Sequence, residues 1–219
     1  MEGVRPGGDC GMIVRAMIAG IVLAAGFSAR MGRPKALLPV GAGGPTFVHR
    51  LVDTLRLSGL DPVIVIAGAD AARIRTALQD VEPPVLIAVN DDPSRGQLSS
   101  LAIALELADR LGVEAALVVP VDQPLIAPAT VAHLISVYRG LHAQVVRPVH
   151  GVRHGHPVIF DRLLFDELRH ADPAEGARSV VRAHAAATVD VPVEDEGVFT
   201  DIDTRDDYER AFGAPPRKD

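Results

Sequence analysis

The sequence has 219 residues, of which 48% are hydrophobic, 23% charged and 4% aromatic, and its formal net charge at pH 7 is −6. An acidic chain lacks the basic footprint of a nucleic-acid-binding protein, and no apolar run reaches the ~18–20 residues that a membrane span needs. The single cysteine, Cys10, excludes an internal disulfide and a cysteine-rich zinc site. We expect a cytoplasmic globular protein with aliphatic helix-on-sheet packing, and no nucleic-acid or membrane partner.

Strand-like and helix-like segments alternate along the first 140 residues. The first is the continuous apolar run 18–25, typical of a strand that is covered on both faces. Three more buried strands are predicted at 62–67, 85–89 and 115–121. Helices are predicted after each strand, at 46–58, 70–78, 98–111 and 128–138. This order indicates a three-layer α/β/α fold of Rossmann-like type, with a mostly parallel, mixed sheet and right-handed crossovers.

The second half of the chain is less regular. Short strands are predicted at 145–148 and 157–160 around the turn GVRHGHP, and a further strand at 188–191. Helices are expected at 161–169, 177–184 and 204–212. Because no Pro/Ser-rich linker or repeat divides the chain, we expect one domain over residues 18–212, a disordered leader over 1–17 and a frayed tail over 213–219.

Ligands of open α/β sheets bind beyond the carboxyl ends of the strands, which places a single site at residues 24–35, 68–70, 90–100 and 120–125. In the first loop, Gly26 and Gly32 let backbone N–H groups approach a ligand, while Arg30 and Lys35 suggest that the ligand is an anion. The spacing matches neither the P-loop nor the dinucleotide fingerprint. Solvated loop cations are the alternative interpretation of Arg30 and Lys35.

Asp122 follows a strongly apolar strand, where a lone carboxylate is poorly solvated unless it is paired. Mg²⁺ bound to triphosphate oxygens would satisfy it, because Mg²⁺ commonly uses one or two carboxylates together with substrate phosphates. Asp201 and Asp203 offer a second carboxylate. The alternatives are that Asp122 caps a turn and that Asp203 or Thr204 caps the last helix.

Five motifs spread over residues 18–212 carry a family resemblance: LAAGFSARMGRPKALLP, GQLSSL, VPVDQPL, GHPVIF and DIDTRDDY. Together they resemble nucleotidyltransferases of the nucleotide-diphospho-sugar transferase (GT-A) fold that modify the molybdenum cofactor. GQLSS before a helix and DQP after the fourth strand resemble the molybdenum cofactor cytidylyltransferase branch. One departure is Arg205, which stands where the family often has proline.

The resemblance implies a magnesium-dependent transfer of CMP, with Mn²⁺ as a substitute metal. The terminal phosphate of molybdopterin would attack the α-phosphorus of CTP, giving molybdopterin cytosine dinucleotide and pyrophosphate. Such displacements need positioning and charge neutralisation more than a protein nucleophile. Arg30, Lys35 and Asp122 would be the catalytic residues, and Asp122 would hold the metal with Asp203, or less favourably Asp201.

The resemblance also implies which residues contact the nucleotide: Leu23, Ala24, Ala25, Gly26, Arg30, Lys35, Gly68, Gln97, Ser99 and Ser100. The related guanylyltransferase has a second glycine where this chain has Ala25, so the Ala-Ala-Gly form favours the smaller pyrimidine. Gln97, Ser99 and Ser100 lie where the family contacts base and ribose, and uncharged side chains suit a nucleobase edge. A cluster that caps the following helix is the alternative.

The acceptor side is less distinct. Arg153, His154 and His156 lie in one turn, and the GHP sequence at its end matches the family pattern. We expect Arg153 and His156 to bind the acceptor; a metal site and a purely structural turn are the alternatives. Arg178, with the two residues before it, also matches the family, without an assigned role.

Two other functions stay open from the sequence. One is an enzyme of the same fold with another base or acceptor: a guanylyltransferase, or an enzyme that acts on a sugar phosphate or phospholactate. The other is a non-enzymatic carrier that binds molybdopterin and docks on a molybdenum hydroxylase. Because a pure carrier needs no triphosphate and metal site, Arg30, Lys35 and Asp122 favour an enzyme with small-molecule substrates, for which transient docking on a hydroxylase is a further expectation.

Overall fold

The computed structural model describes residues 17–28 and 30–214. The expected disordered leader lies outside these residues except for Met17, and so does the expected tail from residue 215 on. None of the helices in the described ranges has the length and apolar character needed to cross a bilayer.

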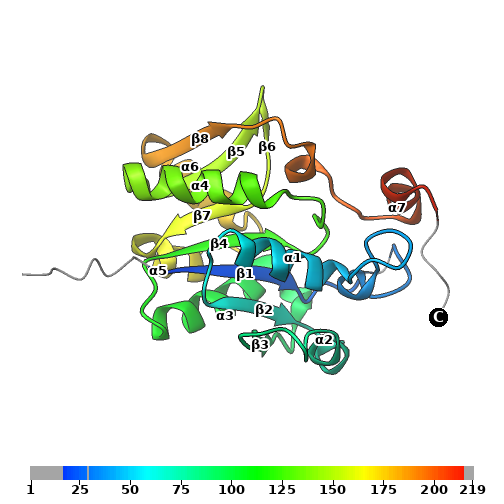
Figure 1. Cartoon of the computed structure of the whole chain (residues 1–219). Coiled ribbons are helices and arrows are strands. Elements are labelled where there is room, and N and C mark those ends of the chain that lie inside the picture. Colours follow the sequence, from blue (N-terminus) through cyan, green and yellow to red (C-terminus); the bar gives the residue numbers. More distant parts are fainter. Residues whose placement is uncertain (1–16, 29, 215–219) are drawn as a thin grey trace, which may run out of the picture.

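In the described part of the chain, eight strands form one mixed sheet in the order β3-β2-β1-β4-β7-β5-β6, with β8 paired to β5 (Figure 1). Their bounds are β1 Ile18–Ala24, β2 Val63–Ala67, β3 Leu86–Val89, β4 Ala115–Pro120, β5 Val145–His150, β6 Arg153–His154, β7 Val158–Asp161 and β8 Thr188–Pro192.

The first four strands are parallel, as the alternation of strands and helices predicts. In the centre of the sheet, Val22 of β1 lies opposite Val65 of β2 and Val119 of β4. The chain then reverses: β7 is antiparallel to β4, and β5 is antiparallel to β7. The carboxyl ends of β1 to β4 therefore share one edge of the sheet, where we expect the site.

Helices cover both faces of the sheet, which confirms the three layers. Their bounds are α1 Phe47–Leu57, α2 Ala71–Ala77, α3 Gln97–Arg110, α4 Pro128–Leu141, α5 Phe165–Arg169, α6 Ala177–Ala183 and α7 Arg205–Phe212. One apolar layer joins Val22 to side chains of α1, α2, α4 and α7. The opposite layer joins Ile21 and Leu23 to α3, α5 and α6. Because neighbouring residues of a strand point to opposite faces, a strand that is apolar throughout is buried by both layers.

Two segments differ from the expectation, for local reasons. The helix expected at 161–169 is divided into a 3-10 turn, Arg162–Leu164, and α5, because the Asp161 side chain caps the turn by accepting from Leu163 N. The helix expected to end at 138 continues to Leu141, where His142 takes a left-handed conformation with φ 48° and donates its N–H to the Tyr138 carbonyl.

Candidate active site

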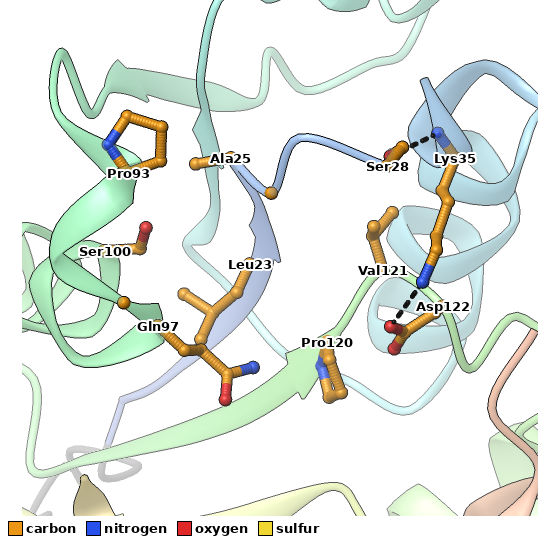
Figure 2. Close-up of a pocket in the computed structure, with 12 residues that line it drawn as sticks. Leu23, Ala25, Ser28, Lys35, Pro93, Gln97, Ser100, Pro120, Val121 and Asp122 are labelled. Carbon is orange, nitrogen blue, oxygen red and sulfur yellow. Dashed lines mark hydrogen bonds and ion pairs between the residues drawn. The ribbon is translucent and has the colours of Figure 1, made fainter. Parts of the chain in front are cut away.

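A small cavity of about 190 Å³ opens at the carboxyl ends of β1 and β4 (Figure 2). It is lined by Leu23, Ala25, Gly26, Ser28, Lys35, Pro93, Gly96, Gln97, Ser100, Pro120, Val121 and Asp122. Lys35 and Asp122 form a charged wall on one side, and Pro93, Gln97 and Ser100 form an uncharged wall on the other, with Leu23 and Ala25 between them. The cavity thus has one half suited to an anion and one half suited to a neutral ring.

Lys35 is the centre of the charged wall. Its Nζ donates to Asp122 Oδ2 at 3.1 Å and also contacts Asp203 Oδ1. The Lys35 side chain is only 11% exposed, whereas those of Asp122 and Asp203 are 25% and 30% exposed. Arg30 extends the cluster, since its Nη2 donates to Asp203 Oδ2 at 2.8 Å. Residues from both ends of the chain therefore form one group of opposite charges.

The pKa values reflect this balance. Burial alone would lower the pKa of Lys35, but the hydrogen bonds and charges of Asp203 and Asp122 outweigh it and raise the pKa above its usual value. The hydrogen bond from Lys35, followed by the charges of Lys35 and Arg30, holds the pKa of Asp203 below its usual range despite some burial. Both groups are therefore charged at neutral pH.

The loop after β1 is shaped by Ser28, which the sequence did not single out. Ser28 takes φ 50°, and its carbonyl accepts from the N–H groups of Met31 and Gly32. Its Oγ accepts from the Lys35 backbone N at 3.0 Å. Met31 is fully buried and anchors the loop in the core. These bonds hold Ser28 against the backbone of Met31, Gly32 and Lys35, and bring Lys35 back over the end of β1.

Not every predicted nucleotide contact lines the cavity. The structure brings together Leu23, Ala25, Gly26, Lys35, Gln97, Ser100 and Asp122. Ala24 belongs to the opposite apolar layer, and Arg30 lies on the rim with its side chain 72% exposed. Gly68 lies behind the cavity: a Cβ there would be 2.7 Å from the Ala25 carbonyl oxygen, so glycine permits a close approach of two backbones. Ser99 donates to the Gly96 carbonyl instead.

A larger cavity of about 660 Å³ adjoins the first and shares Leu23, Gln97 and Pro120 with it. His156 and Arg178 line this second cavity. Arg153, which was predicted beside His156, lies apart from the lining residues. Its guanidinium pairs with Glu196 at 2.8 Å and lies 4.6 Å above the centre of the Phe199 ring.

His156 is half-buried next to the carboxylates. Burial lowers the pKa of its imidazole, and the positive charge of Arg178 acts in the same direction. The charges of Asp201 and Asp122 oppose this effect without reversing it. His156 is therefore a neutral donor or acceptor at neutral pH on the wall of the larger cavity.

Asp201 faces a different partner from Asp203. Its Oδ1 accepts from Gln123 Nε2 at 2.7 Å, and Gln123 is itself buried. The described residues contain no group of three or more His, Cys, Asp or Glu side chains arranged for a metal. Asp122 and Asp203, however, converge on one ammonium group, and hard carboxylate oxygens are the protein ligands that Mg²⁺ or Mn²⁺ accepts next to substrate phosphates. The donor set fits such a cation, with Asp203 better placed than Asp201.

The sequence did not single out three residues that contact site residues in the structure: Ser28, Asn90 and Gln123. Each is a polar residue within three positions of the end of a predicted strand and inside a segment selected as a ligand loop. That position was the available signal, but only the structure shows which of their atoms hold neighbouring residues in place. Arg205, in contrast, simply begins α7.

Residues 20–189 match the family described as MobA-like NTP transferase domain. The chain is 35% identical to a "Probable molybdenum cofactor guanylyltransferase" of Rhodopirellula baltica over 130 residues, 59% of each chain. It is 31% identical to a protein of the same name from Mycolicibacterium paratuberculosis over 179 residues, 80% of this chain and 86% of the relative.

Two solved structures from Mycobacterium tuberculosis are similar over 91% of this chain. One has 32% identity, a TM-score of 0.78 and 98% of its own length covered. The other, a complex with manganese, has 30% identity, a TM-score of 0.74 and 100% covered. A nucleotidyl transferase from Methanothermobacter shares the fold at 24% identity and a TM-score of 0.74. The chain therefore belongs to the family of MobA-like NTP transferase domains and is a nucleotidyltransferase with the GT-A-like fold.

Proposed function

We propose that this protein transfers CMP from CTP to the terminal phosphate of molybdopterin, with residues 18–212 as one catalytic domain. An oxygen of the acceptor phosphate attacks the α-phosphorus, the bond from that phosphorus to the bridging oxygen breaks, and pyrophosphate leaves. The observation that carries the proposal is that Lys35, which lines the small cavity together with Asp122, contacts both Asp122 and Asp203. The molybdenum cofactor as acceptor is supported by the names of the relatives.

The charged wall supplies what this displacement needs. Lys35 and Arg30 bind the triphosphate and stabilise the negative charge that builds up on the α-phosphate and pyrophosphate. Asp122 and Asp203 would hold a divalent cation, which neutralises charge on the phosphate oxygens when bound. The manganese complex of a relative supports such a cation. No general base is required, because the attacking phosphate is already an anion.

The uncharged wall supports a pyrimidine. The Ala25 side chain lines the cavity together with Pro93, Gln97 and Ser100 (Figure 2). A methyl group at this position reduces the room for a base compared with glycine, which favours a single ring. Gln97 offers both a donor and an acceptor to the edge of that ring.

The second cavity is the proposed acceptor site. It meets the first at Leu23, Gln97 and Pro120, so a phosphate at this boundary would lie next to the triphosphate. His156 supplies a neutral polar group there, and Arg178 a cation. Arg153 lies outside this cavity, paired with Glu196, and would reach an acceptor only if that pair opened.

The test compares binding of CTP, GTP, ATP and UTP to the purified protein, each with Mg²⁺ and with a chelator. A preference for CTP that depends on Mg²⁺ supports the proposal, and turnover is then measured as pyrophosphate release with molybdopterin as acceptor. If the protein binds molybdopterin but does not bind any of the four nucleotides, the proposal is overturned in favour of a carrier. Docking on a molybdenum hydroxylase stays a prediction, to be measured with a purified hydroxylase.

A guanylyltransferase is the second candidate, because the curated relatives described above carry that name. A preference for GTP in the same experiment would establish it against the CTP proposal. The variant Ala25→Gly separates the two further. If the methyl group excludes purines, removing it should improve GTP binding relative to CTP binding.

A further inference from the structure

Asn90 is a buried polar residue directly after β3, and it connects three segments. The residue is 4% exposed, and its backbone N–H donates to the Ala67 carbonyl at the end of β2. Its amide Nδ2 lies 2.9 Å from both Ser99 Oγ and Ser100 Oγ at the start of α3. Its Oδ1 accepts from Asp92 N at 3.0 Å. Both N–H donors of this amide, and its oxygen through one bond, are directed at hydroxyl and backbone groups around the uncharged wall.

These bonds determine the direction of every hydrogen bond in the cluster. A backbone N–H only donates, so the atom of Asn90 that faces Asp92 must be the carbonyl oxygen. The two serines therefore face the NH₂ group, and both hydroxyl oxygens act as acceptors. The Ser99 hydroxyl donates its own hydrogen bond to the Gly96 carbonyl, at 2.7 Å.

Ser100 is different, because the described residues offer no acceptor that its proton is bonded to. Within residues 17–28 and 30–214, the Ser100 hydroxyl is paired only with Asn90, which occupies it as a donor. Ser100 is 4% exposed and lines the small cavity. Its proton is therefore available to a group that enters the cavity, while its acceptor site is already filled.

We propose that Asn90 is a positioning residue that fixes Ser100 as a hydrogen-bond donor to the bound nucleotide, and so selects an acceptor atom on the base or ribose at this point. The inference rests on the proposed function, in which the nucleotide occupies this cavity. On a cytosine base, the carbonyl oxygen O2 and the ring nitrogen N3 are such acceptors, whereas the exocyclic amino group is not.

The test is a double-mutant cycle on nucleotide binding, with Asn90→Ala, Ser100→Ala and the combined variant. Without the amide, the Ser100 hydroxyl is free to turn its proton to a backbone carbonyl. We expect the nucleotide Kd and KM to rise about 3–10-fold in Asn90→Ala, with kcat unchanged. In the Ser100→Ala background, the same change at position 90 should have no further effect.

Asn90→Asp is the second variant, for the case that alanine destabilises the fold. A carboxylate at position 90 keeps the shape and still accepts from Asp92 N, but it accepts a hydrogen bond from the Ser100 hydroxyl instead of donating one to it. Its added charge acts equally with and without the Ser100 hydroxyl, so the cycle removes that contribution. Thermal unfolding of every variant shows that the protein is folded.

Two outcomes overturn the inference. An equal rise in Kd with and without the Ser100 hydroxyl would mean that Asn90 acts on α3 as a whole. An unchanged Kd in both position-90 variants would mean that Asn90 does not determine how Ser100 is oriented toward the ligand. Failure of the proposed function is distinct from both, because it is read from the wild-type protein, which would then bind none of the four nucleotides or prefer one other than CTP.

Discussion

Lys35 is held between two carboxylates in a half-buried position, and its charge is the feature on which the cavity's anion site depends. Its ammonium group contacts Asp122 and Asp203, and these contacts keep its pKa raised against the effect of burial. If the ammonium is removed, the two carboxylates face each other without a counter-charge between them. The site would then repel a triphosphate instead of attracting it.

We therefore predict that Lys35→Ala weakens binding of the triphosphate and lowers turnover by about 10²-fold or more, since it removes a charge aimed at the reacting phosphates. The matched control is Lys35→Arg, which keeps the charge. Nucleotide Kd and pyrophosphate release are the measurements. An effect limited to the KM of the pterin acceptor would show that the loop after β1 serves the other substrate.

The two candidate metal ligands make a second residue-scale prediction. Asp122→Ala should reduce turnover by about 10³-fold or more with the fold intact, because a bound metal carries a large share of the charge stabilisation. Asp203→Asn should reduce turnover in the same way. Asp201→Asn, which changes the partner of Gln123, should reduce turnover much less. Near-normal turnover of Asp122→Ala would reject its metal role. A larger loss of turnover in Asp201→Asn than in Asp203→Asn would mean that Asp201, and not Asp203, is the second metal ligand.

The sequence predicted the residue types at this site better than their contacts. Lys35 and Asp122 were recognisable because each follows a buried strand, and strand ends of a parallel sheet meet. The contacts of Asp203 with Lys35 and Arg30 join residues 168 and 173 positions apart. They depend on how β7, β5 and β8 return the chain to this edge of the sheet. The residues next to Asp203 in the sequence do not predict that path. Asn90 and Ser28 were missed because their roles lie in bond direction and backbone conformation.

At the scale of elements, α7 holds Asp203 in place. Thr204 caps the helix by accepting from Asp207 N, and the Asp207 side chain accepts from Thr204 N in return. Tyr208 is 2% exposed, and its ring lies 4.7 Å from that of Phe212 and 6.2 Å from that of Phe47 in α1. The cap and the aromatic contacts fix the helix immediately after Asp203.

We predict that Tyr208→Ala lowers the free energy of unfolding by about 3–5 kcal/mol, as expected for a large aromatic ring removed from a core. Tyr208→Phe loses only the hydrogen bond to the Pro39 carbonyl, at 2.8 Å, and should cost about 1 kcal/mol. Urea unfolding measures both. Because a loose α7 releases Asp203, Tyr208→Ala should also need more Mg²⁺ for half-maximal turnover, unlike Tyr208→Phe. If both variants need the same Mg²⁺ concentration for half-maximal turnover, α7 does not hold Asp203 in place for metal binding.

The pair of strands β5 and β8 gives a prediction on pH. Arg147 lies opposite Asp190 in the parallel register and donates to it at 2.6 Å. This hydrogen bond, with the charges of Arg147 and His154, holds the pKa of Asp190 below its ordinary value of 3.8. Since the folded-state pKa is the lower one, this stabilisation is complete above the unfolded-state pKa and is lost as the pH falls through the folded-state pKa.

Thermal unfolding of Asp190→Asn should therefore depend less steeply on pH below about pH 5 than that of the wild-type protein, and its melting temperature should be lower at neutral pH. Some dependence should stay, because the pKa values of Asp203 and Asp207 are lowered too. Parallel pH curves for the two proteins would show that the pair contributes nothing to the fold.

The elements themselves were largely predictable, and their arrangement only in part. Buried parallel strands and amphipathic helices such as α1 and α3 leave clear patterns of apolar residues. The order of β7, β5 and β8 does not follow from periodicity, because pairing partners are chosen by packing across the sheet. The two-residue strand β6 was predicted as part of a turn, since nothing in Arg153 and His154 distinguishes them from turn residues.

At the scale of the whole molecule, the small cavity joins distant parts of the chain. Lys35 and Ala25 come from the loop after β1, Ser100 from α3 and Asp122 from the end of β4, and Asp203 reaches Lys35 from the segment before α7. A nucleotide with a divalent cation would bind to all of these segments at once. Such a ligand binds the folded chain and not the unfolded one, so it must raise the stability of the entire fold.

Binding should therefore appear as a shift in global unfolding. At a nucleotide concentration of 100 times Kd, the gain is about 2.7 kcal/mol, which for a chain of this size corresponds to an increase in melting temperature of about 5–10 °C. The increase should need CTP and Mg²⁺ together, and should be lost in Asp122→Ala. An equal increase with a chelator present would contradict the metal site while keeping the nucleotide site. An increase that Asp203→Asn leaves intact would mean that the C-terminal segment takes no part in binding, and that the meeting of the two ends at Lys35 only stabilises the fold.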